Sequence, residues 1–326
     1  MIDNLFSPIL AAILDYFIGD PRNWLHPVQV MGWAIANFTQ FSLKFLPFPK
    51  GRRLAGAILG IGLITLSGGV GWLIIQGANW LHPLLGITLE SILLASCFAG
   101  RSLRKAAIDV LQPLNAGNLP QARLTLSNYV GRDTENLSAS EILRAILETV
   151  TENATDGVMA PLFYAMVGLF FPGIGSVPFA LAYKAASTLD SMVGYRTEPY
   201  TDFGWFSAKL EDILTWIPCR LTVITLAFLS GKPRQVWRLC WRDAPKDSSP
   251  NSGWSECAYA AALGVQLGGT NSYRGVIKDK PFLGDAIAPI TPKTIDQALQ
   301  LTRYSFLLWL AIAISALANQ RVMSAE

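Results

Sequence analysis

The chain has 326 residues, of which 51% are hydrophobic and only 15% are charged, and its formal net charge is +3. Soluble domains carry about a quarter charged residues, so this shortage over so long a chain indicates burial in lipid. The composition excludes disordered chains, fibres and small disulfide scaffolds, and the net charge is too small to indicate a nucleic-acid partner. We therefore expect an all-α fold, a polytopic membrane helical bundle with cytoplasmic helical loops and re-entrant or interfacial helices.

The amino-terminal segment is typical of a membrane helix rather than a cleaved signal peptide. Asp3 stands where a signal peptide is positively charged, and Asp15 interrupts the apolar run. We expect a first membrane segment over residues 5–18. Residues 28–46 place polar side chains on one side of a helix and apolar side chains on the other, which favours an interfacial amphipathic helix over a span.

Residues 54–78 predict the clearest transmembrane helix, because they carry no charge. The many glycines in this segment indicate close helix contacts rather than a nucleotide loop. Residues 84–99 form a returning helix. Basic residues flank both ends of this hairpin, at Arg52 and Arg101 among others, so we place those ends in the cytoplasm.

The rest of the chain alternates polar and apolar stretches. Residues 101–156 are too charged for lipid but have a roughly helical pattern. Residues 158–186 are apolar but broken by prolines, which suits a re-entrant or kinked pair of short helices lining a cavity. Residues 213–229 are interrupted by Pro218, and residues 306–318 make a terminal membrane helix of marginal length.

We therefore predict a single integral-membrane domain over residues 1–326. Residues 101–156 would form a cytoplasmic helical segment, and residues 187–209 and 231–300 would form polar loops and helices at the same face. The four cysteines have no C-x-x-C pairing and only two histidines accompany them, which argues against a zinc or iron–sulfur site.

Within the polar segment, Ser138 and Glu141 form a capping box that predicts the start of a helix. At 3.6 residues per turn, Glu141, Glu148 and Glu152 fall on the face opposite the apolar side chains. We expect these carboxylates to face water or a cavity.

Like charges at this spacing repel, and Asp156 adds another just beyond the helix. A magnesium ion or a basic loop would relieve the crowding. The alternative is a solvated helix face on which Arg144 offsets Glu148. Asn153 falls on the apolar side, where an amide needs partners, and this favours a site.

Three polar clusters stand where apolar runs end. They are Leu14 to Pro21 with His26, Asn128 to Thr134, and Tyr183 to Arg196. Ionisable groups at such boundaries are functional candidates, and basic side chains gathered with serine and glycine suit a phosphate. Interfacial snorkelling by Lys184 and Arg196 is the alternative.

The sequence has no P-loop, dinucleotide fingerprint or nucleophile elbow. It resembles the CobD/CbiB family in motifs that run in order over most of the chain, from near residue 10 to near residue 290. These motifs are LDYFIGDP, HPV, VGRDT, ETVTENATDGVMAPLFY, YKAASTLDSMVGYR, IPCRLT and SPNSGWSECAYAAALGVQLGG.

This resemblance implies a multi-pass ligase of cobalamin biosynthesis, adenosylcobinamide-phosphate synthase, in the cell (inner or plasma) membrane with its active site facing the cytoplasm. The family joins adenosylcobyric acid to (R)-1-amino-2-propanol O-2-phosphate at the expense of ATP, giving adenosylcobinamide phosphate. Mg²⁺ and the co-substrate ATP would be required, with no bound prosthetic group. Ethanolamine phosphate and threonine phosphate remain open as amine donors. The implied partners are this corrinoid substrate, the amine phosphate, the lipid bilayer and other membrane enzymes of late cobalamin assembly, without nucleic acid.

Residue type and position suggest the roles within this activity. Magnesium would be held by Glu148, Glu152 and Asp156, and catalysis would involve Asp190, Glu152 and Lys184, with Asp190 as a second metal ligand or as the base that deprotonates the amine. The remaining substrate-binding candidates are Asp15, Asp20, His26, Arg132, Asp133, Arg196, Asn251, Ser252 and Trp254. A rival hypothesis is a membrane transporter or sensor that binds a small polar or corrinoid ligand without turnover.

Overall fold

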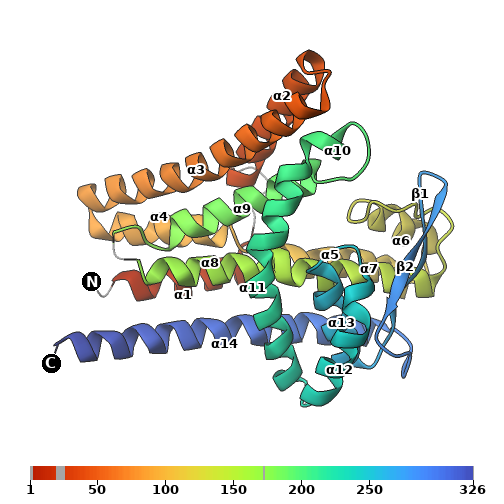
Figure 1. The fold of residues 1–326 in the computed structure, drawn as a ribbon. Helices are drawn as coiled ribbons and strands as arrows, with labels where there is room; N and C mark the ends of the chain where they lie inside the picture. The colour runs from red at the N-terminus through yellow and green to blue at the C-terminus, as the bar shows by residue number, and fades with distance from the viewer. Residues whose placement is uncertain (1–2, 20–25, 172, 326) are drawn as a thin grey trace. The chain divides into compact units, whose positions relative to one another are not determined.

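The computed structural model describes residues 3–19, 26–171 and 173–325, and it is helical apart from one two-stranded sheet in that part of the chain (Figure 1). The all-α prediction is therefore confirmed. The chain divides into two compact units. Unit 1 comprises residues 1–99, 160–215 and 309–326, and unit 2 comprises residues 100–159 and 216–308.

The helices of unit 1 are α1 (Asp3–Phe17), α2 (Pro27–Phe45), α3 (Pro49–Leu81), α4 (Pro83–Ala95), α8 (Ala160–Leu169), α9 (Ser176–Val193) and α10 (Tyr200–Phe203). Unit 2 contains α5 (Gly100–Asn115), α6 (Leu119–Leu126), α7 (Ala139–Asn153), the π-helical turn η1 (Ala154–Met159), α12 (Pro233–Asp243), the 3₁₀ turn η2 (Ala244–Lys246), α13 (Ser252–Leu263) and strands β1 (Leu267–Tyr273) and β2 (Val276–Leu283). Helices α11 (Trp205–Leu229) and α14 (Pro292–Ala325) contribute to both units.

Four described helical stretches are long and apolar enough to cross a membrane: Pro49–Leu81, Pro83–Asn115, Trp205–Leu229 and Pro292–Asn319. This confirms the membrane-protein prediction and corrects two of its elements. Pro218 does not interrupt α11, which is a continuous helix, and the terminal helix is much longer than residues 306–318. The predicted first membrane segment is a helix, α1, but its apolar part is shorter than those four stretches.

The glycines of α3 do bring neighbouring helices close, as predicted. A Cβ added at Gly56 would lie 1.9 Å from the carbonyl oxygen of Phe203, and one at Gly71 would lie 2.6 Å from Leu181 in α9. By contrast, a Cβ at Gly62 would meet nothing within 4 Å. One face of α3 therefore packs so closely against its neighbours that it requires glycine, which has no Cβ.

Local signals around the polar segment are also confirmed. The Ser138 side chain accepts from the Glu141 amide, and the Glu141 carboxylate accepts from the Ser138 amide at 2.7 Å, so α7 begins with the predicted capping box. The proline-broken stretch predicted over residues 158–186 begins with the end of η1 and continues as the two helices α8 and α9, which are separated by a turn near Gly173.

The hairpin of β1 and β2 was not predicted. Its antiparallel register pairs Tyr273 with Val276, so Arg274 and Gly275 form a two-residue turn, and both have positive φ, at 53° and 77°. Such a turn requires left-handed backbone at both central positions. A register shift interrupts the ladder at Gly268, where a Cβ would lie 2.0 Å from the carbonyl oxygen of Pro281.

Candidate functional site

Glu148 joins α7 to the hairpin through a buried network of charges. Its side chain is only 1% exposed, and its Oε1 accepts from the Gly268 amide at 2.9 Å and from Arg144 Nη1 at 3.2 Å. Its Oε2 accepts from Arg132, which also donates to Asn271 Oδ1 at 2.8 Å. The prediction that Glu148 faces water or a cavity is therefore wrong, because guanidinium groups and a backbone amide surround both of its oxygens.

The predicted offset of Glu148 by Arg144 is present, and the loop residue Arg132 supplies the basic loop that we considered as an alternative to magnesium. Arg132 is 9% exposed in this ion pair. We therefore assign it a positioning role rather than the phosphate-binding role expected from the sequence. Asn153 is exposed and donates to Thr149 in its own helix, at 2.9 Å, so it does not lie on the apolar face.

Two further carboxylates fix the ends of the same hairpin. Asp133 accepts from the amides of Arg274 and Gly275, both at 2.8 Å, which stabilises the left-handed turn. The hydrogen bond from Ser272, followed by these amides, lowers the pKa of Asp133. Asp133 was expected to bind substrate, but in the structure its carboxylate caps a turn.

At the other end of the hairpin, Asp243 is 1% exposed and accepts from the Gly284 amide at 3.1 Å. Burial alone would raise the pKa of Asp243, but hydrogen bonds from Arg242, Lys246 and this amide lower it to about 2. Asp243 is therefore ionised throughout the neutral range.

The middle of β2 carries Lys280, which pairs with Glu256 of α13. Lys280 Nζ donates to Oε1 at 2.6 Å and to Oε2 at 2.8 Å of Glu256, which is completely buried. Burial by itself would lower the pKa of Lys280, but the carboxylates of Glu256 and Glu152 outweigh it and raise the pKa above its usual range. The ammonium group therefore stays charged at neutral pH.

Glu152 lies one helical turn beyond Glu148 and has a different environment. Its side chain is exposed, and no salt bridge within the described residues involves it. Even so, the pKa of Glu152 is raised, first because surrounding protein displaces water that would stabilise the carboxylate, and also because Asp247 and Glu148 add negative charge, while Lys280 acts in the opposite direction. Glu152 is thus a reachable carboxylate beside a cation.

Asp156 is in the π-helical turn η1, and such turns are frequent at functional sites. The turn is fixed to α13 because Thr155 Oγ1 and Ser255 Oγ lie 2.8 Å apart and Ser255 also donates to the Thr151 carbonyl at 2.6 Å. Within the described residues, no group of three or more His, Cys, Asp and Glu side chains is arranged to hold a metal ion. The full predicted set does not fit magnesium, since the oxygens of Glu148 are occupied, which leaves Glu152 and Asp156 from that set.

The three predicted residues at the start of α13 lie near Arg220. Asn251 Oδ1 accepts from Arg220 Nη1 at 3.0 Å, and the Arg220 guanidinium lies 4.6 Å from the centre of the Trp254 ring. Ser252 is half-buried, and its amide donates to Ser249 at 3.1 Å. Asn251 and Trp254 therefore contact a cation, Arg220, that was not among the predicted site residues.

The other predicted catalytic residues belong to unit 1. Lys184 and Asp190 are both on α9, and Asp190 lies close enough to Glu211 to act on it electrostatically. Asp190 Oδ1 lies close against Gly194, because a Cβ added to this glycine would lie 1.8 Å from that oxygen. Arg196 is exposed and acts electrostatically on Asp212.

Glu211 belongs to a buried polar network that sequence reasoning missed. It accepts from Thr215, whose hydroxyl lies 2.8 Å from the Tyr183 hydroxyl, and the Tyr183 ring stacks on Tyr164 with centres 4.9 Å apart. Unit 1 therefore gathers Asp190 and Glu211 near a pair of hydroxyl groups.

Two of the early predicted residues lie in described helices or caps of unit 1. Asp15 is buried in α1, and His26 caps α2 by accepting from the Val28 amide at 3.2 Å. Asp20 lies outside the described residues.

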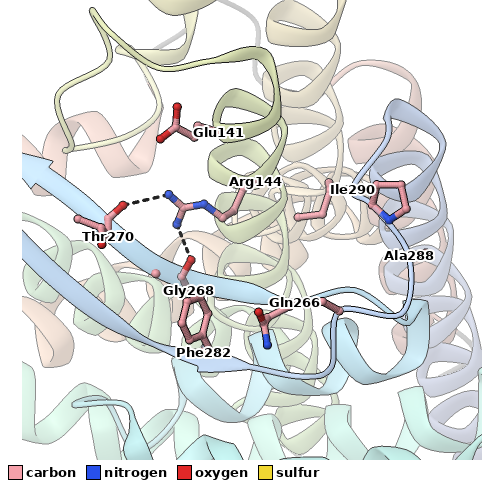
Figure 2. Close-up of a pocket in the computed structure, with 11 residues that line it drawn as sticks. Glu141, Arg144, Gln266, Gly268, Thr270, Phe282, Ala288 and Ile290 are labelled. Atoms are coloured by element: carbon pink, nitrogen blue, oxygen red, sulfur yellow. Dashed lines mark hydrogen bonds between the residues drawn. The ribbon is translucent and has the colours of Figure 1, made fainter.

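Unit 2 also has a pocket of about 430 Å³ between the start of α7, the hairpin and residues 286–290 (Figure 2). Arg144 donates across it to the carbonyl oxygens of Gly268 at 2.7 Å and Thr270 at 3.1 Å, and Phe282 and Gln266 lie beside these bonds. Glu141 also lines the pocket, and the hydrogen bonds of Ser138 lower its pKa. The volume suits a small ligand or one part of a larger one.

The chain is similar to known proteins over nearly its whole length. The profile of the family described as CobD/Cbib protein matches residues 8–302. The chain belongs to the CobD/CbiB family. Cobalamin biosynthesis protein CobD of Synechocystis is 53% identical over 321 residues, covering 96% of this chain and 94% of that protein. Cobalamin biosynthesis protein CbiB of Salmonella typhi is 40% identical over 311 residues, covering 94% and 95%. No solved structure matches the chain.

The CobD/CbiB motifs recognised in the sequence are divided between the two units. The segments around Arg132, Glu152 and Trp254 belong to unit 2, whereas the segment from Tyr183 to Arg196 belongs to unit 1. Lys280 and the hairpin strand that carries it were missed, because nothing local in the sequence distinguishes a buried lysine from a surface one. The Gly268-Gly269 pair that ends one family motif was the available signal for the pocket.

Proposed function

We propose that this member of the CobD/CbiB family acts in cobalamin biosynthesis as adenosylcobinamide-phosphate synthase. In this reaction ATP would convert a carboxylate of adenosylcobyric acid to an acyl phosphate, and the amine of (R)-1-amino-2-propanol O-2-phosphate would displace phosphate to form the amide. The similarity over nearly the whole length to relatives named as cobalamin biosynthesis proteins supports this pathway. We place the protein in the cell membrane with the site facing the cytoplasm.

The observation that best supports an acid–amine ligase is the exposed carboxylate of Glu152, which Lys280 is close enough to influence electrostatically. The amine arrives as an ammonium ion, so a base must remove a proton before attack, and a carboxylate with a raised pKa is better suited to this than an ordinary one. Glu152 is exposed and its pKa is raised. We therefore assign it the role of this base.

Lys280 would stabilise negative charge that develops beside Glu152 during acyl transfer, because its ammonium is held charged by Glu256. Magnesium that accompanies ATP needs only one or two protein carboxylates besides the phosphates, and Asp156 fits that requirement, which leaves Glu152 to take the proton. Bound there, magnesium would neutralise charge on the transferring phosphoryl group. In unit 1, Lys184 and Arg196 remain candidates for phosphate binding, and Asp190 remains the candidate for a second metal ligand or for an alternative base.

The test is an assay of the full-length protein in lipid nanodiscs with adenosylcobyric acid, ATP, Mg²⁺ and one of three amines: aminopropanol phosphate, ethanolamine phosphate or threonine phosphate. We expect an amide product by mass and ADP in equal amount, with Glu152→Gln strongly impaired and the control Glu135→Gln unaffected, since Glu135 is exposed on another segment. No product with any amine would refute the proposal, and corrinoid binding without turnover would favour a transporter or sensor.

A further inference from the structure

Helix α12 has two faces of opposite character. Its buried face consists of Val236, Leu239, Cys240 and Asp243, which follow the i, i+3, i+4, i+7 spacing of a helix face. The same spacing, shifted by two residues, gives an exposed face of Arg234, Trp237, Arg238 and Trp241. The packing of α12 against unit 2 therefore leaves two arginines and two tryptophans outside (Figure 1 shows α12 beside α13).

The two arginines of this face have no partner in the described part of the chain. Arg242, one residue further on, is engaged by Asp243 at 2.6 Å and Asp285 at 2.8 Å. Neither a hydrogen bond nor an ion pair with a described residue involves Arg234 or Arg238, so their charges are available to an anion outside the protein.

The tryptophans of the face are unusually exposed for their size. Trp237 is 48% and Trp241 is 59% exposed, and their ring centres lie 5.9 Å apart. Trp241 also contacts Trp254 edge-on, at 5.5 Å, and the Arg220 guanidinium lies over both Trp254 and the half-exposed Trp216. The exposed face of α12 is thus continuous with an aromatic row that reaches Trp216 on α11.

We propose that the exposed face of α12 is a binding site for the phosphate headgroups of anionic lipids at the surface of the protein's own membrane. Tryptophan prefers the boundary between headgroups and acyl chains, and arginine forks match phosphate oxygens. Helix α12 begins four residues after the end of α11, which is a candidate membrane span, so the chain keeps this face near a bilayer. Unpartnered positive charge on this face complements an anionic leaflet. This inference goes beyond the proposed function, since it requires no turnover.

The experiment measures amide hydrogen exchange in the peptide covering residues 232–243, in the full-length protein. Nanodiscs contain phosphatidylcholine alone or phosphatidylcholine mixed with phosphatidylglycerol. Each basic side chain near an anionic surface strengthens binding about fivefold, so we expect exchange to slow by up to about 25-fold in the anionic discs. High salt should remove most of this protection.

Arg234→Gln/Arg238→Gln should lose the protection that depends on anionic lipid, whereas Arg234→Lys/Arg238→Lys should keep most of it. The matched control is Lys278→Gln/Lys293→Gln, which removes two exposed charges from other segments and should change nothing. Trp237→Ala/Trp241→Ala should lower protection in both kinds of disc.

Three outcomes would overturn the proposal. The first is equal exchange of the wild-type helix in both discs, and the second is equal loss of protection in the Lys278/Lys293 control. The third is equal protection when inorganic phosphate is added to neutral discs, which would identify a site for a free anion instead of a lipid.

Discussion

The two units of the molecule are stabilised by different chemistry. In unit 1, α3 places glycines against Phe203 and α9, so close helix packing dominates. In unit 2, carboxylates from separate helices hold a hairpin at its beginning, middle and end, through Glu148, Glu256 and Asp243. The chain as a whole has few charged residues, but in unit 2 a few of them hold the helices and the hairpin together.

The largest effect should follow removal of Glu148 from unit 2. Glu148→Ala leaves the largely buried guanidinium groups of Arg132 and Arg144 without their carboxylate, which we expect to cost about 3–5 kcal/mol in the free energy of unfolding. Thermal unfolding in detergent, compared with the exposed control Glu135→Gln, measures it. A loss no greater than that of the control would contradict the structural role of the Glu148 network.

The pair of Lys280 and Glu256 should show strong coupling. Lys280→Met leaves a completely buried carboxylate unpaired and should cost about 3 kcal/mol or more, whereas Lys280→Met/Glu256→Gln should recover much of that loss. A double-mutant cycle of unfolding free energies measures the coupling. Additive losses would show that Lys280 and Glu256 do not form a coupled pair.

In unit 1 the equivalent test concerns α3. Gly56→Ala places a methyl group 1.9 Å from the Phe203 carbonyl oxygen and should destabilise unit 1 by about 1–3 kcal/mol. Gly62→Ala in the same helix meets nothing within 4 Å and should be neutral or slightly stabilising, because alanine favours helix more than glycine does. Equal thermal stability of the two variants would contradict close packing at Gly56.

The contrast between the two units also explains which helices could be predicted from the sequence. Hydropathy and glycine content are local properties, so α3, α4 and the α8–α9 pair were predictable. The capping box at Ser138 was predictable for the same reason. The continuity of α11 through Pro218 was not, because packing overrides the local preference of proline.

The candidate site depended on pairs far apart in sequence. Glu148 and Glu152 look alike as positions on one helix face, and only tertiary structure brings Arg132 to the first and Lys280 near the second. The prediction that the carboxylates of α7 repel one another was correct, and at Glu148 the guanidinium groups of Arg132 and Arg144 offset this repulsion. Family motifs located Glu152 and Trp254, whereas Lys280 lay outside every motif that we recognised.

The smallest effect on stability, and the largest on activity, should come from Glu152→Gln. Because the folded state raises the pKa of Glu152, it binds the proton more tightly than the unfolded chain does, so this group lowers stability as pH rises above the unfolded pKa. Glu152→Gln should therefore be as stable as wild type or slightly more stable at neutral pH, with the difference disappearing at acidic pH below that value.

If Glu152 is the base, amide formation by the same variant should fall by about 10²–10⁴-fold. The wild-type rate should decline on acidification at a higher pH than an ordinary glutamate would give. Thermal unfolding and rate profiles against pH, on one preparation of each variant, separate these effects. A variant that loses stability and activity together would place Glu152 with Glu148, as a structural carboxylate, and would move the search for the base to Asp190 in unit 1.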